Sequence, residues 1–296
     1  MDDGVREKLR LAGKVAAEAR ALGVSLCAEG ALLLDVAERI EAHMRSRGSP
    51  PAFPTCLSID HVAAHYSPVH NDRTALRRGN VVKLDLGAQV DGYIADTAAT
   101  VEVGTRNWTD LIRASEVACE TAIEVCRPKT PTRLIGSAIE RAIESFGFKP
   151  ISNLTGHTIE RYNLHAGKSI PNVGGLGGDV VEAGDTLAIE PFSTNGAGKV
   201  EGRKSGNIYR LLSTRDIAPP SLNEFLRRIE ESFKTLPFAE RWAYALDHKA
   251  PAHLGRLLRA GRIMTYESLL DAGRGIVAQT EHTMIVDGGG VEVTTR

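Results

Sequence analysis

The sequence has almost no net charge, because 36 Lys and Arg residues nearly balance 37 Asp and Glu residues. Nothing in that balance indicates binding to nucleic acid or to an anionic membrane. The longest apolar stretches fall far short of the ~20 residues that a membrane-spanning helix needs. The acidic start, Met1-Asp2-Asp3, also lacks the basic-then-apolar order of a signal peptide. We therefore expect no membrane partner and no specific nucleic-acid partner.

Cysteine is scarce, and no C-x-x-C pair occurs. The cysteines are Cys27, Cys56, Cys119 and Cys126. Cys119 and Cys126 are seven residues apart in a predicted helix, so both should face the core. This usage is typical of a reducing compartment, and the sequence predicts a cytoplasmic protein.

Three familiar catalytic motifs are missing. No G-x-S-x-G occurs, which excludes the nucleophile elbow of the α/β-hydrolases. Gly167-Lys168-Ser169 resembles the end of a phosphate-binding loop, but Tyr162 stands where that loop requires an earlier Gly. The glycine-rich stretch Gly174-Gly175-Leu176-Gly177-Gly178 lacks the dinucleotide-binding spacing. The chemistry must therefore be sought in other side chains.

The sequence does contain a clear β-hairpin. Val81 to Val90 is rich in aliphatic and β-branched residues, Asp91-Gly92 is a pair that a type I′ turn favours, and Tyr93 to Val103 supplies the return strand. A two-residue turn pairs residue 85 with residue 98. Asp85 and Asp96 then share one face as diagonal neighbours, with Cβ atoms roughly 7 Å apart.

Two carboxylates at this range on apolar strands need a neutralising partner, because a buried unpaired charge is strongly destabilising. Lys83 lies on the same strand face as Asp85, so a Lys–Asp ion pair is one alternative. It satisfies one carboxylate but hardly both. A two-metal site, whose ions lie roughly 3.5–4 Å apart, fits two diagonal carboxylates well. The hairpin favours metal binding, provided that more ligands follow.

Further candidate ligands do follow. Glu190 and Glu281 each interrupt an apolar predicted strand, and His157 and His165 flank a segment rich in Gly and polar residues. An Arg partner could explain either glutamate alone, and a single His is more often structural than a ligand. Four acids on apolar strands, together with a His, are more economically explained by one shared pair of cations. His65 is a further candidate that, taken alone, reads as structural.

The order of predicted elements suggests two similar halves. Helices at about 2–23 and 31–46 precede the hairpin, and helices at about 109–126 and 133–146 precede a predicted strand at 185–192. No residue-level repeat accompanies this order of elements. The sequence thus predicts an α/β (α+β) fold.

The segment 201–274 differs in character and is mildly basic. Ser221-Leu222-Asn223-Glu224 resembles a capping box ahead of an amphipathic helix, and two shorter helices should follow. A strand from Gly275 should then rejoin the main sheet. We expect a catalytic domain of residues 1–200 and 275–296, with residues 201–274 as a helical, winged-helix-like insertion subdomain.

With these residues in place, the chain resembles the type 2 methionine aminopeptidases, in the archaeal-like short form that lacks a charged N-terminal extension. The resemblance covers nearly the whole chain. Its motifs, in the family's order, are the Asp85 and Asp96 hairpin, Gly156-His157, Leu164-His165-Ala166-Gly167-Lys168-Ser169-Ile170-Pro171, Ile189-Glu190-Pro191-Phe192 and Gln279-Thr280-Glu281-His282-Thr283. One departure is Asp60-His61, which replaces an Asn-rich pair and could alter the polarity of the pocket.

The resemblance implies a pita-bread (creatinase/aminopeptidase) fold, in which two pseudo-twofold halves form an antiparallel sheet covered by helices. It also implies two divalent metal ions, which would be cobalt, manganese, iron or zinc. Asp85 would chelate one ion, and His157 and Glu190 would complete the other. Asp96 and Glu281 would bridge both.

The resemblance further implies catalytic roles. Glu190 would relay the proton of the attacking water, while His65 and His165 would bind the peptide and the tetrahedral oxyanion. The methionine pocket would contain Phe53, Leu164 and Tyr266, whose alternative interpretation is ordinary core packing. We expect a monomeric hydrolase that removes Met from the N-termini of peptides and nascent proteins, with the ribosome as a candidate partner.

Two alternatives stay open. An X-Pro dipeptidase of the same fold would keep all five metal ligands, although the insertion and the spacing of His65 from Phe53 favour the aminopeptidase. A non-catalytic scaffold that binds ribosomes or RNA through the basic insertion is the second alternative. Such relatives have lost ligands, whereas all five are present here, and a balanced helical face is more often simply solvated.

Overall fold

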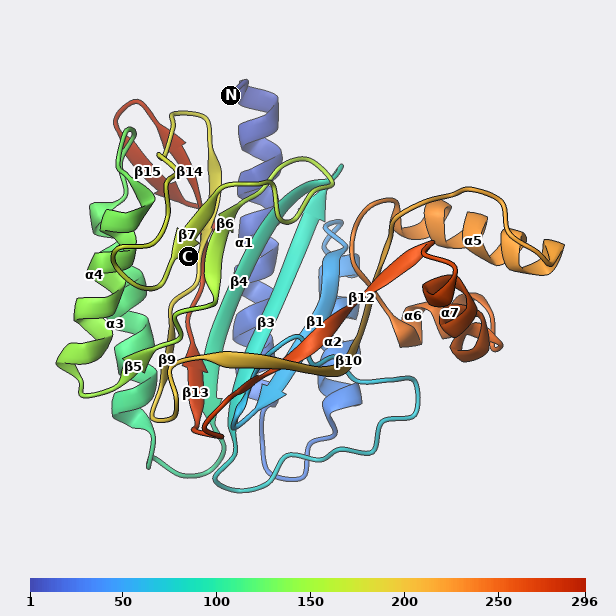
Figure 1. Cartoon of the computed structure of the whole chain (residues 1–296), viewed down its shortest axis with the longest axis horizontal. Helices are drawn as coiled ribbons and strands as arrows, with labels where there is room; N and C mark the ends of the chain where they lie inside the picture. Colours follow the sequence, from blue (N-terminus) through green and yellow to red (C-terminus); the bar gives the residue numbers. More distant parts are fainter.

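The computed structural model describes residues 1–296, except for the side chains of residues 203–205. Two groups of helices and strands lie side by side, and a third group projects from one of them (Figure 1). All strand pairs in the described part of the chain are antiparallel. None of the described helices has the length and apolar character that crossing a membrane requires.

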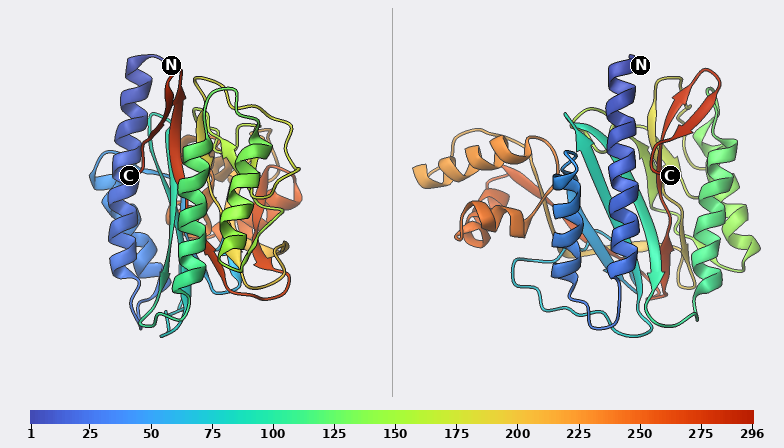
Figure 2. Two further views of the ribbon diagram at one scale, coloured as in Figure 1. Left: turned by 90° about the vertical axis from the view of Figure 1, so that its left-hand side faces the viewer. Right: turned by 180° about the vertical axis from the view of Figure 1, so that it is seen from behind.

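The first half contains α1 (Asp3–Leu26), α2 (Leu33–Ser46), β1 (Pro51–Ile59), β2 (Val62–Ala64), β3 (Val81–Val90) and β4 (Tyr93–Glu102). Three of these strands form a sheet in the order β1-β3-β4. Both helices cover one face of that sheet (Figure 2). The apolar stripe of α1, which includes Ala12 and Ala16, packs there against Leu84 and Leu86 of β3.

The hairpin of β3 and β4 has the predicted register. Asp85 lies opposite Ala98, which is two residues from Asp96 on β4. Asp91 and Gly92 have φ angles of 52° and 85°, the left-handed pair that a type I′ turn requires. The predicted turn and the predicted pairing are therefore confirmed.

The second half contains α3 (Thr109–Val125), α4 (Thr132–Ser145), β5 (Lys149–Pro150), β6 (Thr155–Thr158), β7 (Ser169–Pro171), β8 (Thr186–Ile189), β9 (Phe192–Thr194), β13 (Val277–Gln279), β14 (His282–Asp287) and β15 (Gly290–Val293). Its sheets have the orders β15-β14-β8-β6-β7 and β13-β9-β5. Cys119 and Cys126 are buried in its core, as predicted. Each half thus has two helices over its strands, as the order of elements suggests.

The predicted strand at 185–192 is interrupted. β8 ends at Ile189 and β9 begins at Phe192. Pro191 lies in the gap, and a proline cannot donate to a strand ladder. The interruption leaves Glu190 outside regular pairing, at the edge of the site described below.

The third group contains β10 (Val200–Leu211), α5 (Pro220–Phe233), β11 (Phe238–Ala239), α6 (Glu240–Leu246), α7 (Ala250–Arg259) and β12 (Ile263–Asp271). Its sheet has the order β11-β10-β12-β2, so a strand of the first half extends it. The long strands β10 and β12 are not predicted from the sequence, because their residues mix apolar, charged and small types without strict alternation. The domain boundaries at 200 and 275 stay predictions.

The start of α5 differs from the prediction. The helix begins at Pro220 with Pro219 as its N-cap, so the predicted capping box at Ser221 is wrong. A proline in the first turn has a suitable φ and no N–H that needs a cap. Asn223 instead accepts a hydrogen bond from Ile217 N at 2.6 Å, which holds the preceding loop.

Candidate metal centre

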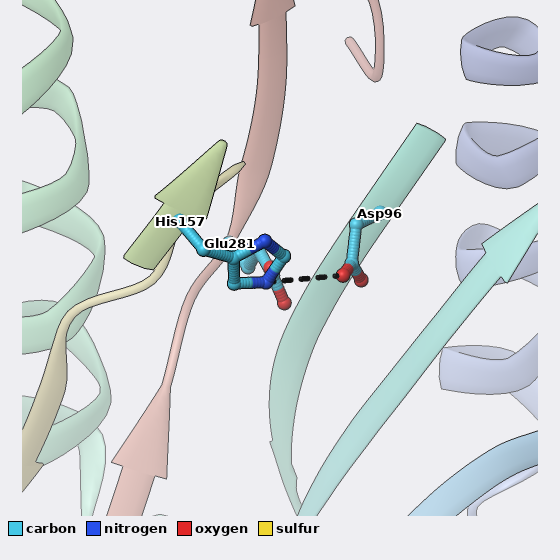
Figure 3. A group of neighbouring side chains, drawn as sticks. All are labelled: Asp96, His157 and Glu281. Carbon is cyan, nitrogen blue, oxygen red and sulfur yellow. Dashed lines mark ion pairs between the residues drawn. The ribbon is translucent and has the colours of Figure 1, made fainter. Parts of the chain in front are cut away.

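Four carboxylates and the imidazole of His157 lie together in one cavity where the two halves meet. Asp85, Asp96 and His157 come from β3, β4 and β6, whereas Glu190 and Glu281 lie in the breaks after β8 and β13. His157 Nε2 lies 3.8 Å from Asp96 Oδ2 and 3.6 Å from Glu190 Oε1. One ligand atom each of Asp96, His157 and Glu281 lies within 4.8 Å of the other two (Figure 3). These atoms are close enough to share a bound cation.

Backbone pairing between the halves places Glu281. Ala98 N donates to Glu281 O at 3.3 Å, and Glu281 N donates to Ala98 O at 3.1 Å. Nearby, Thr283 Oγ1 accepts from Asp96 N at 2.7 Å and donates to Asp96 O at 2.8 Å. These bonds hold β4 against Glu281 and the start of β14, and so bring two acids from distant parts of the chain together.

Burial shifts the titration of this cluster. It raises the pKa of Asp85 to about 7. It also raises the pKa of Asp96 well above its ordinary value, with further contributions from the carboxylates of Asp85 and Glu190. The pKa values of Glu190 and Glu281 are raised mainly by burial as well. Burial lowers the pKa of His157 to about 4, so its imidazole is neutral and can donate a lone pair.

Among the described residues no Lys or Arg forms an ion pair with the four acids; His157 lies within ion-pair distance of two of them, Asp96 and Glu190. The Lys–Asp alternative does not hold, because Lys83 Nζ donates to the backbone oxygens of Asp60 at 2.6 Å and Val81 at 3.4 Å. Several buried carboxylate oxygens have no hydrogen-bond partner, namely Asp85 Oδ1, Asp96 Oδ1 and Glu281 Oε1. Carboxylate oxygens that receive no hydrogen bond, together with a neutral imidazole, form a set of ligand atoms that divalent cations bind.

Gln279 belongs to the cluster and was missed by sequence reasoning. Its Nε2 lies 3.3 Å from Glu281 Oε2, 3.4 Å from Glu190 Oε2 and 3.5 Å from Asp85 Oδ2. The amide nitrogen has two N–H donors, so it can bind two of these carboxylates at a time but cannot neutralise them. The sequence contained this information, because Gln279 is two residues from Glu281 on an extended segment. The two side chains therefore point to the same face.

The cavity is also lined by every other residue predicted for the site, namely Phe53, His65, Leu164, His165 and Tyr266. Burial lowers the pKa of His165 to about 3 and also lowers the pKa of His65, so both rings are neutral. The ring centroids of His65 and Tyr266 are 5.5 Å apart, edge to face. The lining also includes three residues that were not predicted, Cys56, Ile208 and Pro237. The structure thus brings all ten predicted residues together, while their individual roles stay predictions.

Asp60 does not change the polarity of the pocket, contrary to expectation. It has a φ of 53°, and its carboxylate accepts hydrogen bonds from Val81 N and Asn80 Nδ2, both at 2.9 Å. Neither Asp60 nor His61 is among the residues that line the cavity. The Asp60 side chain closes a turn ahead of β3.

The fold and the site define a metal-dependent hydrolase of the pita-bread architecture. Residues 7–287 match metallopeptidase family M24, and the chain belongs to that family. A methionine aminopeptidase of Methanocaldococcus jannaschii is 45% identical over 290 residues, which cover 98% of each chain. Within the family, the chain therefore groups with the methionine aminopeptidases.

Solved structures show the same fold. A thermophilic Arx1 has a TM-score of 0.87 at 21% identity, and the match covers 99% of this chain and 91% of that chain. A methionine aminopeptidase of Thermotoga maritima has a TM-score of 0.72 at 22% identity, and covers 100% of this chain and 98% of that chain. At these identities the likeness concerns the fold alone.

Proposed function

We propose that the chain is a type 2 methionyl aminopeptidase, which hydrolyses the peptide bond after an N-terminal methionine in peptides and nascent proteins. The observation that carries this proposal is the convergence of four acids, all buried or half-buried, and a neutral imidazole in one cavity. Family membership and the 45% identity to a relative named methionine aminopeptidase support the same activity.

The cluster would hold two divalent ions. Asp85 would bind one ion, and His157 and Glu190 the other, while Asp96 and Glu281 would bind both. Such ions would supply Lewis acidity and would lower the pKa of the attacking water toward neutrality. Carboxylate oxygens with one imidazole suit cobalt, manganese, iron and zinc, so all four metals are candidates.

Side chains of the cavity would handle the protons and the developing charge. Glu190 would accept the proton of the attacking water and pass it to the leaving amine. His65 and His165 would bind the peptide and donate hydrogen bonds to the carbonyl oxygen as it gains negative charge.

The remaining cavity residues would recognise the substrate. Phe53, Leu164 and Tyr266 would contact the methionine side chain; Phe53 and Leu164 already pack together in one apolar cluster. The acidic cluster would hold the free α-amino group through charge-assisted hydrogen bonds. An enzyme built in this way needs a free N-terminus and is therefore an exopeptidase.

Hydrolysis of Met-Ala-Ser, measured with and without EDTA, tests the proposal. We expect the metal-loaded protein to release free Met, and we expect EDTA to abolish this release until Mn²⁺ or Co²⁺ is added in excess. Elemental analysis of the purified protein would give the number of bound ions. Preference for an X-Pro dipeptide would overturn the methionine assignment, and metal-loaded protein that cleaves neither substrate would favour the binding scaffold.

The setting of this activity is also part of the proposal. We place the enzyme in the cytoplasm, as a monomer acting on N-termini that emerge from the ribosome. The four cysteines are free and buried, which supports a reducing compartment. Residues 1–200 and 275–296 would form the catalytic domain, with 201–274 as the insertion subdomain.

A further inference from the structure

Residues 234–241, here called the strap, connect the end of α5 to the start of α6 and pass along the cavity. Pro237 lines the cavity. Leu236 packs with Phe53 and Leu164 in the apolar cluster beside it. Polar side chains at the start of the strap bind the second half of the molecule, and those at its end bind the first half. The strap is therefore anchored on both sides of the acidic cluster.

The first anchor is formed by Lys234 and Thr235. Lys234 Nζ donates to the hydroxyl of Tyr162 at 2.8 Å, and Thr235 Oγ1 donates to the backbone oxygen of Tyr162 at 2.6 Å. Tyr162 N in turn donates to Gly92 O, at the turn of the hairpin, at 2.8 Å. Tyr162 is two residues ahead of Leu164 in the chain, so this anchor reaches the apolar wall of the cavity.

The second anchor centres on Arg241, which is only 5% exposed. Its Nη1 donates to Ser67 Oγ at 2.7 Å and to Pro68 O at 3.0 Å, and its Nη2 donates to the carboxylate of Glu41 on α2. One planar guanidinium therefore binds a helix and two consecutive residues of the loop that follows His65. Only Arg presents several donors in such a rigid fork.

The neighbouring residue Glu240 binds the same loop. Its carboxylate accepts from His70 N at 3.0 Å and lies 2.8 Å from His70 Nδ1. The ring of His70 also stacks on that of Tyr244 at 3.8 Å between centroids. The first two residues of α6 thus bind Ser67, Pro68 and His70 of this loop.

His65, at the start of this loop, has an unusual conformation. Its φ of 66° is in the left-handed region, which costs free energy for a residue other than glycine and persists only where the surroundings impose it. A Cβ on Gly206 would lie 1.8 Å from His65 O, so β10 presses against the backbone of His65. The same residue of β10 also binds the loop, because Ser67 N donates to Gly206 O at 3.1 Å.

We propose that Arg241 is a positioning residue of the active site: by holding Ser67 and Pro68 against α2, it sets the place of His65 in the cavity. The inference rests on the proposed function, in which His65 binds the substrate. Glu41 binds the guanidinium, so the position of α2 determines the position of the loop.

The variant Arg241→Lys tests this role, because it keeps a positive charge opposite Glu41 but offers a single nitrogen to three acceptors. We expect it to fold and to retain bound metal, since the proposed ligands lie on other elements. We expect kcat for Met-Ala-Ser to fall roughly 10- to 100-fold, as is typical when a catalytic group is misplaced by about an ångström. Hydrogen exchange at the amides of Ser67 and His70 should become faster, which a purely electrostatic role would not produce.

Two further variants sharpen the test. Ser67→Ala removes one acceptor of Arg241, together with the hydrogen bond that Ser67 Oγ donates to Thr55 O at 3.0 Å. It leaves the ion pair with Glu41 intact, so we expect a smaller loss of kcat. Arg45→Lys is the matched control: Arg45 Nη2 approaches the same carboxylate at 3.6 Å, but its side chain is 49% exposed. Its kcat should stay within about twofold of the wild type.

The proposal is overturned if folded, metal-loaded Arg241→Lys and Ser67→Ala both keep kcat within about twofold of the wild type. If Arg241→Lys does not fold, the kcat of Ser67→Ala alone decides whether the proposal stands. If the wild-type protein releases no Met from Met-Ala-Ser, the proposed function fails instead. Exchange at the amides of residues 67 and 70 then still shows whether Arg241 holds the loop.

Discussion

The ring of Phe53 contacts the backbone of Gly87 so closely that a Cβ on Gly87 would lie 2.3 Å from Phe53 Cε1. Gly87 lies opposite Asp96 in the hairpin, and Phe53 lines the cavity. In the variant Gly87→Ala the ring must move. We expect a loss of about 1–3 kcal/mol in the free energy of unfolding, as is typical of overpacking, and a higher KM for Met-Ala-Ser. Thermal unfolding and steady-state kinetics would measure both.

Gly255→Ala is the control for this variant. Gly255 lies inside α7, and the nearest atom to an added Cβ is Arg259 Nη1 at 3.7 Å. Alanine is favoured over glycine in a helix, so we expect a gain of about 0.5–1 kcal/mol and unchanged kinetics. An unchanged KM in both variants would mean that Phe53 does not contact the substrate.

Asp96→Asn should abolish turnover and reduce bound metal, because a proposed bridging carboxylate is lost. The fold should stay soluble, and the chelated variant should be at least as stable as chelated wild type, since one of four mutually repelling buried acids is removed. Activity assays, elemental analysis and calorimetry would test these outcomes. Retained activity would refute the bridging role.

His65→Ala should lower kcat by roughly 10²–10³-fold, the usual effect of removing one donor to a developing oxyanion. Metal content should not change, because His65 is not one of the proposed ligands. His61→Ala is the matched control, since His61 is a nearby histidine that is not part of the cavity lining. Loss of bound metal from the His65 variant would contradict a role in substrate binding.

The stabilisation by metal should increase with pH. In chelated protein, burial raises the pKa of Asp85 to about 7 and the pKa values of Asp96, Glu190 and Glu281 well above their ordinary range. Above a pH of about 4, these carboxyl groups are deprotonated in the unfolded chain, whereas they still hold their protons in the folded chain. Their contribution to stability therefore falls as pH rises through the folded-state pKa values. Bound ions replace those protons.

The measurement is the difference in Tm between metal-loaded and chelated protein from a pH of about 6.5 to about 8. Lys83, whose pKa burial lowers to about 7, is present in both samples, so its contribution cancels in the difference. We expect the difference to grow across this range. A difference that stays constant or shrinks would mean that the acids are not the groups that exchange protons for metal.

Local sequence was sufficient for the features that depend on a few neighbouring residues. Asp91-Gly92 and the aliphatic strands on either side determined the turn and the register of the hairpin, and hence the pairing that brings Asp85 near Asp96. The capping box failed for a local reason too, because Pro219 and Pro220 start α5 one residue before Ser221. The long strands of the third group carried no such local signal.

The sequence by itself indicated which five side chains could bind metal and which two acids share one face of the hairpin, because side-chain chemistry and the two-residue period of a strand are local properties. Only the tertiary structure decided which groups are left without partners. It turned Lys83 toward Asp60 rather than Asp85, placed Gln279 among three carboxylates, and bound Arg241 to Glu41. Burial and hydrogen bonding depend on segments that are far apart in the chain, and no local pattern records which of them will meet.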